Sequence, residues 1–314
     1  MEKINKLRKL LNYYNLDGYI VPKNDEFFGE YIPKNKDKLK FISNFSGSYG
    51  FALILKNKNY LFVDGRYTLQ AKIQSGKFFQ VITIPHKFQI KILKNKNYLF
   101  VDGRYTLQAK IQSGNLFYIV TIPNKFPSDV LKNKKLKIGF DPKLHTQKTL
   151  KIFFNKTNCK LIAINQNLIN KFWIKKKGDV LKKFYILPKK AIGENYETKI
   201  NKLINLLEKK KIDFQFISAS ENIAWLLNIR GQDSEFTPVP NAYLTLESTK
   251  RINLFCDLKK VENSFKKRFK NINFIDINYT DLFLAKVKNK KILIDSLSCS
   301  IYFENILKKN NKIK

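Results

Sequence analysis

A stretch of 22 residues occurs twice in this chain, letter for letter. The sequence LKNKNYLFVDGRYTLQAKIQSG runs over residues 55–76 and again over 93–114, a shift of 38 positions. With weaker similarity on both sides, the repeat units cover residues 54–88 and 92–126. Each unit predicts a strand, a helix and a second strand. Two identical apolar faces cannot fill the same place in a core, so one copy must extend the sheet or lie outside it.

The helix of the first copy is expected from Tyr67 onwards. Leu69 and Ile73 lie four residues apart and share one helical face, and Gly76 stands where a helix would end. Two copies alone do not indicate a solenoid, because such architectures need three or more stacked units. We interpret the repeat as a tandem duplication inside a non-repetitive domain, in which either copy could hold the original place. If the extra block is not integrated, deleting residues 89–126 should raise the melting temperature.

Helices and strands alternate along the rest of the chain. An amphipathic helix precedes GYIVP, and GFALIL and NYLFVD read as strands joined by a polar KNKN turn. From residue 195 a helix with Ile200, Leu203, Ile204 and Leu207 on one face begins a second cycle of similar layout. The sequence therefore predicts an α/β protein with two tandem domains of one fold, each a mixed sheet flanked by helices. Domain I is expected over residues 1–174, a charged linker over 175–193, and domain II over 194–314.

The charge is strongly basic, but its kind argues against nucleic acid. The net charge is +35, yet only six of the 60 basic residues are arginine, and the lysines are spread over the whole length. Arginine is the residue suited to bidentate contacts with phosphates and bases, so the composition does not favour specific nucleic-acid binding. The three cysteines have no CxxC spacing, and no apolar run reaches the length of a membrane span. We expect a cytoplasmic protein without a membrane partner.

Residue chemistry alone gives no active site. The two histidines, His86 and His145, are isolated, and the chain has no nucleophile elbow or phosphate-binding loop. The segment VDGRY is the polar cluster of interest, because it places Arg66, or Arg104 in the second copy, after a strand, where α/β folds tend to bind ligands. The competing interpretation is that Asp64 stabilises the turn by pairing with Arg66.

Several segments together resemble a known family. GYIVPKNDEFFGEYIP, KLKFISNFSGSYGFALIL, LFVDGRYTLQA and IGFDPKLHT are similar to the N-terminal domain of Xaa-Pro aminopeptidases (aminopeptidase P), which has the creatinase N-terminal fold. ASENIAWLLNIRGQDSEFTPVPNAYLTL resembles the second domain of the three-domain members. The resemblance covers essentially the whole chain.

The resemblance implies an enzyme family but not a catalytic chain. Members carry a C-terminal pita-bread domain that binds two metal ions, usually manganese, and cleaves the bond before proline. Its ligands have nothing to map onto here, so we assign no catalytic residue, metal ligand or cofactor to this chain. The resemblance does imply substrate binding by the arginine of DGRY, which maps equally onto Arg66 and Arg104. Arg230 in NIRG is expected to serve a turn or an interdomain contact.

Three functions are compatible with these observations. The leading hypothesis is that the chain is the non-catalytic N-terminal region of a Xaa-Pro aminopeptidase-like metallopeptidase and is inactive alone. It would bind a proline-containing peptide only when a catalytic domain is present. The alternative is a binding or oligomerisation module, acting as a homodimer or in trans with a separate catalytic domain. The third, a basic nucleic-acid binder, predicts affinity that falls steeply with salt.

Overall fold

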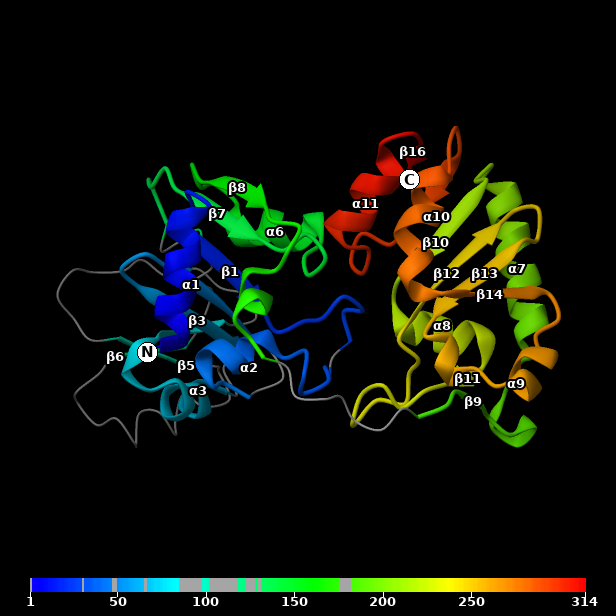
Figure 1. Ribbon diagram of the computed structural model, residues 1–314, viewed down its shortest axis with the longest axis horizontal. Helices are drawn as coiled ribbons and strands as arrows, with labels where there is room; N and C mark the ends of the chain where they lie inside the picture. Colours follow the sequence, from blue (N-terminus) through cyan, green and yellow to red (C-terminus); the bar gives the residue numbers. More distant parts are fainter. Residues whose placement is uncertain are drawn as a thin grey trace. The chain divides into compact units, whose positions relative to one another are not determined.

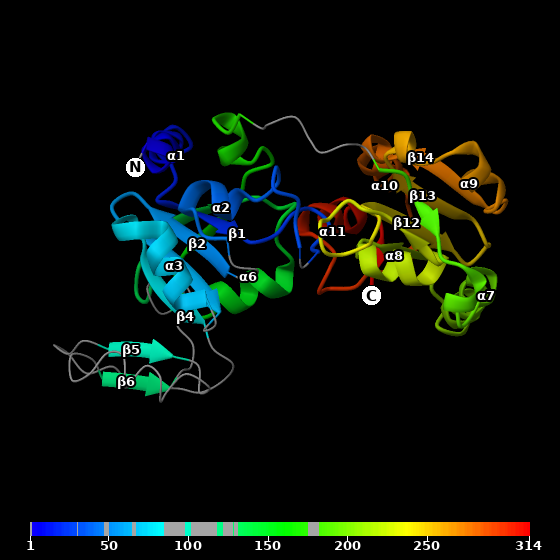
Figure 2. The ribbon, with the colours of Figure 1, turned by 90° about the horizontal axis from the view of Figure 1, so that it is seen from below.

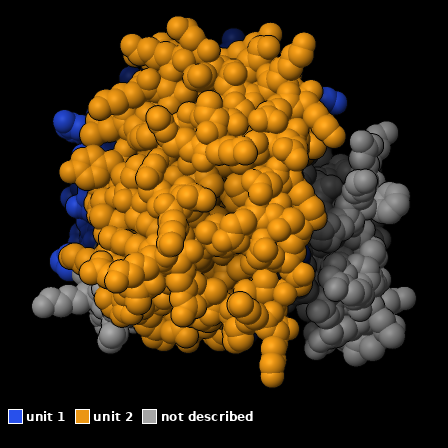
Figure 3. Space-filling model, turned by 90° about the vertical axis from the view of Figure 1, so that its right-hand side faces the viewer, with its two compact units in different colours: residues 1–23, 37–141, 149–174 blue, residues 24–36, 142–148, 175–314 orange. Residues whose placement is uncertain are grey.

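The computed structural model describes residues 2–29, 31–46, 50–64, 67–84, 98–101, 118–121, 128, 131–174 and 182–314, with only the backbone of 83–84, 98–101 and 118–121. The chain divides into two compact units (Figure 3). Unit 1 comprises residues 1–23, 37–141 and 149–174, and unit 2 comprises 24–36, 142–148 and 175–314. Two short segments from the first half of the sequence, 24–36 and 142–148, therefore belong to unit 2.

Unit 1 is built on a six-stranded mixed sheet with strand order β4-β3-β2-β1-β7-β8 (Figure 1). The strands are β1 (Gly18–Pro22), β2 (Gly50–Leu55), β3 (Asn59–Asp64), β4 (Gln80–Ile84), β7 (Lys137–Phe140) and β8 (Lys160–Ala163). β2 pairs antiparallel with both β1 and β3, whereas β4 runs parallel to β3, and β7 runs parallel to β1 and β8. The predicted strands GYIVP, GFALIL and NYLFVD are thus confirmed, including the tight turn between the last two.

Helices cover both faces of this sheet. The elements are α1 (Glu2–Tyr13), α2 (Lys38–Ser43), α3 (Thr68–Ser75), the 3₁₀ segments η2 (Gly76–Phe78) and η5 (Leu168–Lys171), and α6 (Gln147–Phe154). α1 buries Ile4, Leu7 and Leu11 in a core that α2, α3 and η5 share. On the opposite face, Phe153 of α6 stacks on Phe51 of β2 with ring centroids 4.1 Å apart. The result is a three-layer α/β unit.

Unit 2 repeats the same sheet. Its order is β14-β13-β12-β10-β15-β16, and every neighbouring pair has the same parallel or antiparallel sense as its counterpart in unit 1. The strands are β10 (Phe214–Ile217), β12 (Ala242–Glu247), β13 (Ile252–Cys256), β14 (Ile272–Asp276), β15 (Lys291–Leu293) and β16 (Lys312–Ile313). Even the link between the two central parallel strands recurs: the Asp17 carboxylate accepts from the Lys137 backbone N–H at 2.9 Å, and that of Asp213 from Lys291 at 2.8 Å.

The helices of unit 2 follow the same plan. They are α7 (Tyr196–Lys209), α8 (Ser220–Leu227), α9 (Asn263–Lys267), α10 (Thr280–Lys286) and α11 (Ile301–Lys308). α7 buries Ile200, Ile204 and Leu207 against one face together with α8 and α9. α10 and α11 pack on the other face, where Phe27 of segment 24–36 also lies. Within the predicted linker, Tyr185–Ile186 forms strand β9, which pairs with β11 (Ile229–Arg230). The predicted fold class, two domains of one mixed α/β fold, is confirmed.

The first copy of the repeat supplies β3, α3 and β4 of the unit 1 sheet. From the second copy the structure describes two strands, β5 (Tyr98–Val101) and β6 (Tyr118–Thr121), which form a separate parallel pair (Figure 2). Tyr98 pairs with Tyr118, as Tyr60 pairs with Gln80, so the register of β3 and β4 recurs 38 positions later. The helix predicted between β5 and β6 lies outside the described residues.

A comparison of equivalent connections shows where unit 1 is longer than unit 2. In unit 2 the chain passes from β14 to β15 over residues 277–290. The equivalent connection in unit 1, from β4 to β7, covers residues 85–136 and is longer by 38 residues, the period of the repeat. The added length therefore lies after an edge strand and separates no paired strands of the sheet.

Candidate functional site

The region of interest in unit 1 is the end of the sheet where β1 and β3 finish and β2 starts. The backbone N–H of Lys23, just after β1, donates to the carbonyl of Gly50 at 2.9 Å, and Gly50 pairs with Val63 of β3. Asp64, the last residue of β3, is buried there. Gly50 has no room for a side chain, since a Cβ would lie 2.5 Å from the Phe62 carbonyl oxygen. Residues 23, 50 and 64 thus share one end of the sheet.

The predicted substrate-binding arginines, Arg66 and Arg104, lie outside the described residues. The structure does place both neighbours of the Gly65-Arg66 pair. Asp64 ends β3, and Tyr67 is the N-cap residue of α3. The sequence position of Arg66 is therefore between the carboxyl end of a central strand and the start of a helix, as VDGRY predicts. Pairing of Arg66 with Asp64 stays a prediction.

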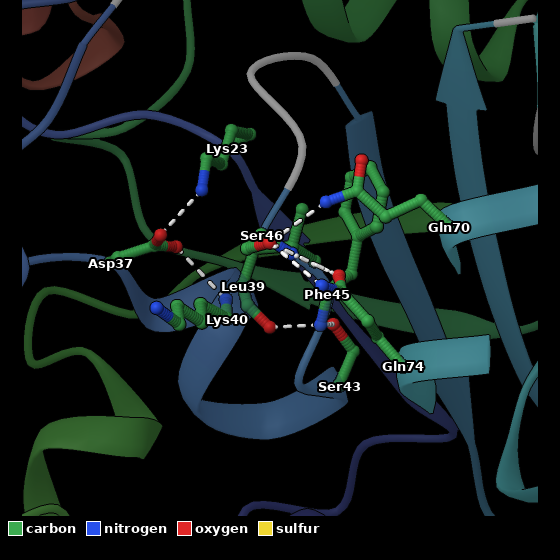
Figure 4. A network of polar contacts seen from close by, with 9 residues as sticks. All are labelled: Lys23, Asp37, Leu39, Lys40, Ser43, Phe45, Ser46, Gln70 and Gln74. Carbon is green, nitrogen blue, oxygen red and sulfur yellow. Dashed lines mark hydrogen bonds and ion pairs between the residues drawn. The ribbon is translucent and has the colours of Figure 1, made fainter. Parts of the chain in front are cut away.

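Gln70 and Gln74 of α3 contact the loop between α2 and β2 (Figure 4). Tyr67, the N-cap residue of α3, contacts the same loop. Tyr67 makes an edge-to-face contact with Phe45, with ring centroids 5.9 Å apart. Gln74 Oε1 accepts from the backbone N–H of Ser46 at 2.9 Å and from its Oγ at 3.1 Å. The side-chain nitrogens of Gln70 and Gln74 each donate to Ser46 Oγ at 2.9 Å. We call this set of contacts the Ser46 clamp.

A buried ion pair lies near the clamp (Figure 4). Lys23 pairs with Asp37, and each side chain is only 8% exposed. Asp37 also begins α2, because its other carboxylate oxygen accepts from the backbone N–H of Lys40 at 2.9 Å, which supplies the N-cap. The pair therefore joins the end of β1 to the start of α2.

These groups can bind and orient a ligand through hydrogen bonds. Among the residues that the structure describes, no cluster of three or more His, Cys, Asp or Glu could hold a metal ion. Burial lowers the pKa of His145 to about 3, so its imidazole is neutral at pH 7. Burial raises the pKa values of Cys256 and Cys299 to about 12, which keeps both as unreactive thiols. His86 lies outside the described residues.

Arg230 serves the structure of unit 2. Its Nη1 donates to the carbonyls of Ala224 at 3.0 Å and Ile229 at 2.9 Å, at the end of α8. Lys199 Nζ donates to the carbonyl of Trp225 at 2.6 Å in the same turn. Both cations thus donate to carbonyl groups in the last turn of α8, where the positive charge is favourable, and Arg230 donates also to a carbonyl of β11. Arg230, which was expected to serve a turn or an interdomain contact, therefore makes contacts within the turn that follows α8.

Unit 2 also contains a cavity of about 970 Å³, between segment 24–36 and loop 232–241. Its buried charges are paired with one another. Lys260 pairs with Asp233, which also accepts from the backbone N–H of Asn241 at 2.7 Å, and Lys36 pairs with Glu26 at 2.5 Å. Burial and, secondarily, the charge of Lys36 lower the pKa of Lys260. The Lys36–Glu26 pair lies within segment 24–36, and the Tyr243 hydroxyl joins this segment to the rest of unit 2 by donating to the Glu26 carbonyl at 3.1 Å.

The residues of the Ser46 clamp were missed from the sequence because neither serine nor glutamine forms a chemical motif there. The usable signal was spacing: Tyr67, Gln70 and Gln74 fall at positions i, i+3 and i+7, on one face of the helix. The ion pair of Lys23 and Asp37 could not be predicted for another reason. They are separated in sequence, and only the fold brings them together.

Two α/β units of one sheet topology make up this chain, and the first carries the Ser46 clamp around Tyr67. Two family models, both described as the Creatinase/Prolidase N-terminal domain, match residues 3–91 and 176–314. The chain therefore belongs to the creatinase/prolidase N-terminal family.

Similar proteins agree with this assignment. The probable Xaa-Pro aminopeptidase P of Neosartorya fischeri is 30% identical over 264 residues, covering 83% of this chain and 35% of that protein. The probable Xaa-Pro aminopeptidase P of Pyricularia oryzae is 29% identical over 302 residues, covering 94% of this chain and 43% of that protein. The chain thus spans well under half the length of these relatives.

One solved structure shares the fold over nearly the full chain. The X-prolyl aminopeptidase of Caenorhabditis elegans, described as a cytosolic enzyme with a di-nuclear active site, superposes with a TM-score of 0.76 at 20% identity. The match covers 99% of this chain and 49% of the worm enzyme. Within the described residues of the present chain, no helix is long and apolar enough to span a membrane.

Proposed function

We propose that this chain is the non-catalytic N-terminal region of a Xaa-Pro aminopeptidase-like metallopeptidase, which helps to bind substrate for a metal-containing catalytic domain. The coverage of the fold match carries the proposal. Nearly all of this chain corresponds to about half of an enzyme that has a di-nuclear active site. The substrate would be a peptide with proline in second position, and the place of action the cytoplasm, as the description of the worm enzyme supports.

The two metal ions implied by the family belong, in this proposal, to the catalytic domain. The described residues of this chain offer no fitting set of ligands, so we derive no hydrolytic step through them. The contribution of this chain is the arginine of DGRY. We propose Arg66 for that role and Arg104 as its rival, because β3, α3 and β4 of the first copy occupy the six-stranded sheet. An arginine there could hold the carboxylate or a carbonyl of the peptide.

The test has two stages. The purified chain with manganese should release no amino acid from an Xaa-Pro peptide. Adding the catalytic domain of the Neosartorya fischeri relative as a separate polypeptide should produce manganese-dependent release. Turnover by the chain alone contradicts the non-catalytic role, and a mixture that stays inactive contradicts action in trans and leaves only a covalently joined catalytic domain.

The arginine is tested in the active mixture. Arg66→Ala should raise KM by roughly ten- to a hundredfold, as expected for the loss of a charge-assisted hydrogen bond. Arg104→Ala is the matched control in an identical local sequence and should leave KM unchanged. If the two substitutions exchange effects, the second copy supplies the substrate contact.

A second candidate, an interaction module, has one observation in its favour. α3 presents Leu69 and Ile73 to solvent, 66% and 73% exposed, and Phe78 follows at 45%. An exposed apolar stripe of this kind often marks a contact surface. Co-purification with a separately encoded catalytic domain would support this candidate, and a monomer that retains no partner would count against it.

A further inference from the structure

Because the two units share one topology, each surface of unit 2 can be compared with its counterpart in unit 1. The turns that follow α1 and α7 each contain a residue in the left-handed region, Asn15 at a φ of 49° and Lys211 at 51°. Two residues later, Asp17 and Asp213 make the equivalent contacts to the central parallel strands. Since these two aspartates differ by 196 positions, a residue of α1 corresponds to the residue of α7 that lies 196 positions later.

In unit 1, the segment that follows the edge strand β8 covers one face of α1. Leu168 of η5 and Leu7 of α1 are both 0% exposed and share one core. Leu10 and Tyr14, on the same face of the helix, are partly buried against this core. The ammonium of Lys171 lies over the Tyr14 ring, 5.2 Å from its centroid. The face formed by residues 7, 10 and 14 is thus closed by η5.

The corresponding face of α7 is more exposed. Leu203 corresponds to Leu7 but is only partly buried, and Leu206, which corresponds to Leu10, is 42% exposed. β16 is the last described element of unit 2, so no described element of that unit is the counterpart of η5. The apolar side chains that η5 covers in unit 1 therefore have equivalents in unit 2 that remain partly open to solvent.

A polar anchor of the covering segment also has its receiving group in unit 2. In unit 1, Asn167 Nδ2 donates to the buried carboxylate of Asp141 at 2.7 Å, at the end of KIGFD. The equivalent sequence KILID of unit 2 ends at Asp295, which is exposed. Its oxygens accept from the Leu297 backbone N–H at 3.0 Å and from Ser298 Oγ at 2.8 Å. Since each carboxylate oxygen can accept two hydrogen bonds, Asp295 can bind a further donor.

The charge around this face indicates the kind of segment that it accepts. α7 leads into three consecutive lysines, and Lys210 stands where unit 1 has Tyr14. A lysine at the position of Lys171 would be repelled by Lys210, whereas an acidic side chain there would be attracted. A second copy of this chain, with its net charge of +35, would bring lysines against lysines. Charge complementarity therefore favours a different, acidic partner.

We propose that Leu203, Leu206 and Asp295 form a docking face for a short segment of the catalytic domain, which covers unit 2 as residues 167–171 cover unit 1. The segment has a polar donor, two adjacent aliphatic side chains and then an acidic residue. The chemistry of the face stands on the comparison of the two units, and the identity of the partner rests on the proposed function.

The face can be tested without any partner by supplying the segment from the chain itself. The full chain is extended after Lys314 by a copy of residues 163–173 that carries Lys171→Glu. In this extended chain, hydrogen exchange of the backbone amides of residues 203–210 should slow by about tenfold, because covering the leucines opposes local opening of α7. Mass spectrometry of the two chains measures this change.

A matched control separates docking from mere extension. The same extension with Leu168→Asp/Ile169→Asp in the copy should leave exchange of α7 as it is in the wild type. Leu206→Asp in the extended chain should likewise abolish the slowing. No slowing by the extension, or equal slowing by the control, would overturn the docking face.

The partner is tested with the catalytic domain of the Neosartorya fischeri relative, taken with the residues that precede it in that protein. Leu206→Asp should weaken the binding of this domain by tenfold or more in calorimetry. Leu282→Asp, at a leucine of α10 that is 60% exposed, is the matched control and should leave binding unchanged. A complex that forms without protecting α7 from exchange, or equal weakening by both substitutions, would overturn the proposal.

Two further outcomes are distinguishable. A dimer of this chain that Leu206→Asp abolishes would show that a second copy occupies the face, which also overturns the proposal. If no complex forms with the catalytic domain, the proposed action in trans fails, while hydrogen exchange of the extended chain still decides whether the face accepts such a segment.

Discussion

His145 is the residue whose ionisation the fold changes most clearly. It lies in segment 142–148 of unit 2 and is fully buried, and burial lowers its pKa to about 3. In the unfolded chain the same imidazole titrates near its usual pKa of about 6.5. Between these two values the unfolded state binds one more proton than the folded state, so acidification favours unfolding.

This difference predicts a specific pH dependence of stability. From pH 7.5 to pH 5, the free energy of unfolding should fall by about 2 kcal/mol, with a slope that approaches one proton. Urea denaturation at several pH values measures it. His145→Asn should remove most of the slope, whereas His86→Asn, at the other histidine of the chain, should not. A wild-type slope near zero in this range would contradict a neutral, buried His145.

Residues of the candidate site were predictable to different degrees. Asp64 and the position of Arg66 followed from a strand signal ending at VDGRY, which depends only on local sequence. The Ser46 clamp and the Lys23–Asp37 pair depend on contacts between distant segments, so no local pattern could reveal them. His145 was interpreted as an isolated histidine without a metal partner, but its burial could not be inferred from HTQ.

Among the elements, α3 shows that predicting a helix is easier than predicting its orientation. The helix and its end at Gly76 are confirmed, with Gly76 at a φ of 59°. The apolar pair Leu69 and Ile73, however, faces solvent, and Ala71 and Ser75 are buried instead. The buried face takes small side chains and the polar Ser46 clamp, a pattern that hydrophobic spacing does not indicate.

The orientation of α3 predicts opposite effects for neighbouring substitutions. Leu69→Lys/Ile73→Lys should change the free energy of unfolding by no more than about 0.5 kcal/mol, because both side chains are exposed. Ala71→Lys should cost about 3 kcal/mol or more, since it buries an unpaired charge. Guanidinium denaturation compares the two. Similar losses for both would mean that the apolar face of α3 is the buried one.

α2 was not predicted as a helix. Lys38–Ser43 is short, and the sequence analysis assigned no element to it. Its N-cap, Asp37, is held by Lys23, and Ser43 Oγ donates to the Leu39 carbonyl at 2.7 Å. A helix this short depends on such contacts more than on intrinsic propensity, which explains why local sequence was insufficient.

At the scale of the whole molecule, the recurrence of one topology was the most predictable feature. In the sequence, a helix, a strand, a glycine-containing loop and a pair of strands occur in this order twice. The two sheets of the structure have the same strand order. The sequence did not predict that segments 24–36 and 142–148 belong to unit 2. Phe27 of the first segment stacks on Tyr243, and the His145 carbonyl of the second accepts from the Ile301 backbone N–H. The periodicity of apolar residues gives no information on contacts between segments so far apart in the sequence.

The matching connection lengths sharpen the expectation for a deletion. Removing residues 89–126 would shorten the β4–β7 connection to the length of its counterpart in unit 2 and keep all six strands of the sheet. The shorter connection costs less closure entropy, by about 1 kcal/mol, which corresponds to about 2–4 °C in melting temperature. Calorimetry of the deletion variant and the full chain tests this. A lower melting temperature after deletion would mean that the second copy contributes structure that unit 1 needs.

The placement of the added length bears on how such chains can change over evolutionary time. A block inserted between β2 and β3 would separate two strands that pair directly and are joined by a tight turn. A block inserted after β4 follows the last strand on that side, so the heritable number of copies can rise or fall while the sheet keeps its order. Selection for folding would then act weakly on copy number. A duplication could therefore persist through many generations without a beneficial or harmful effect on the protein.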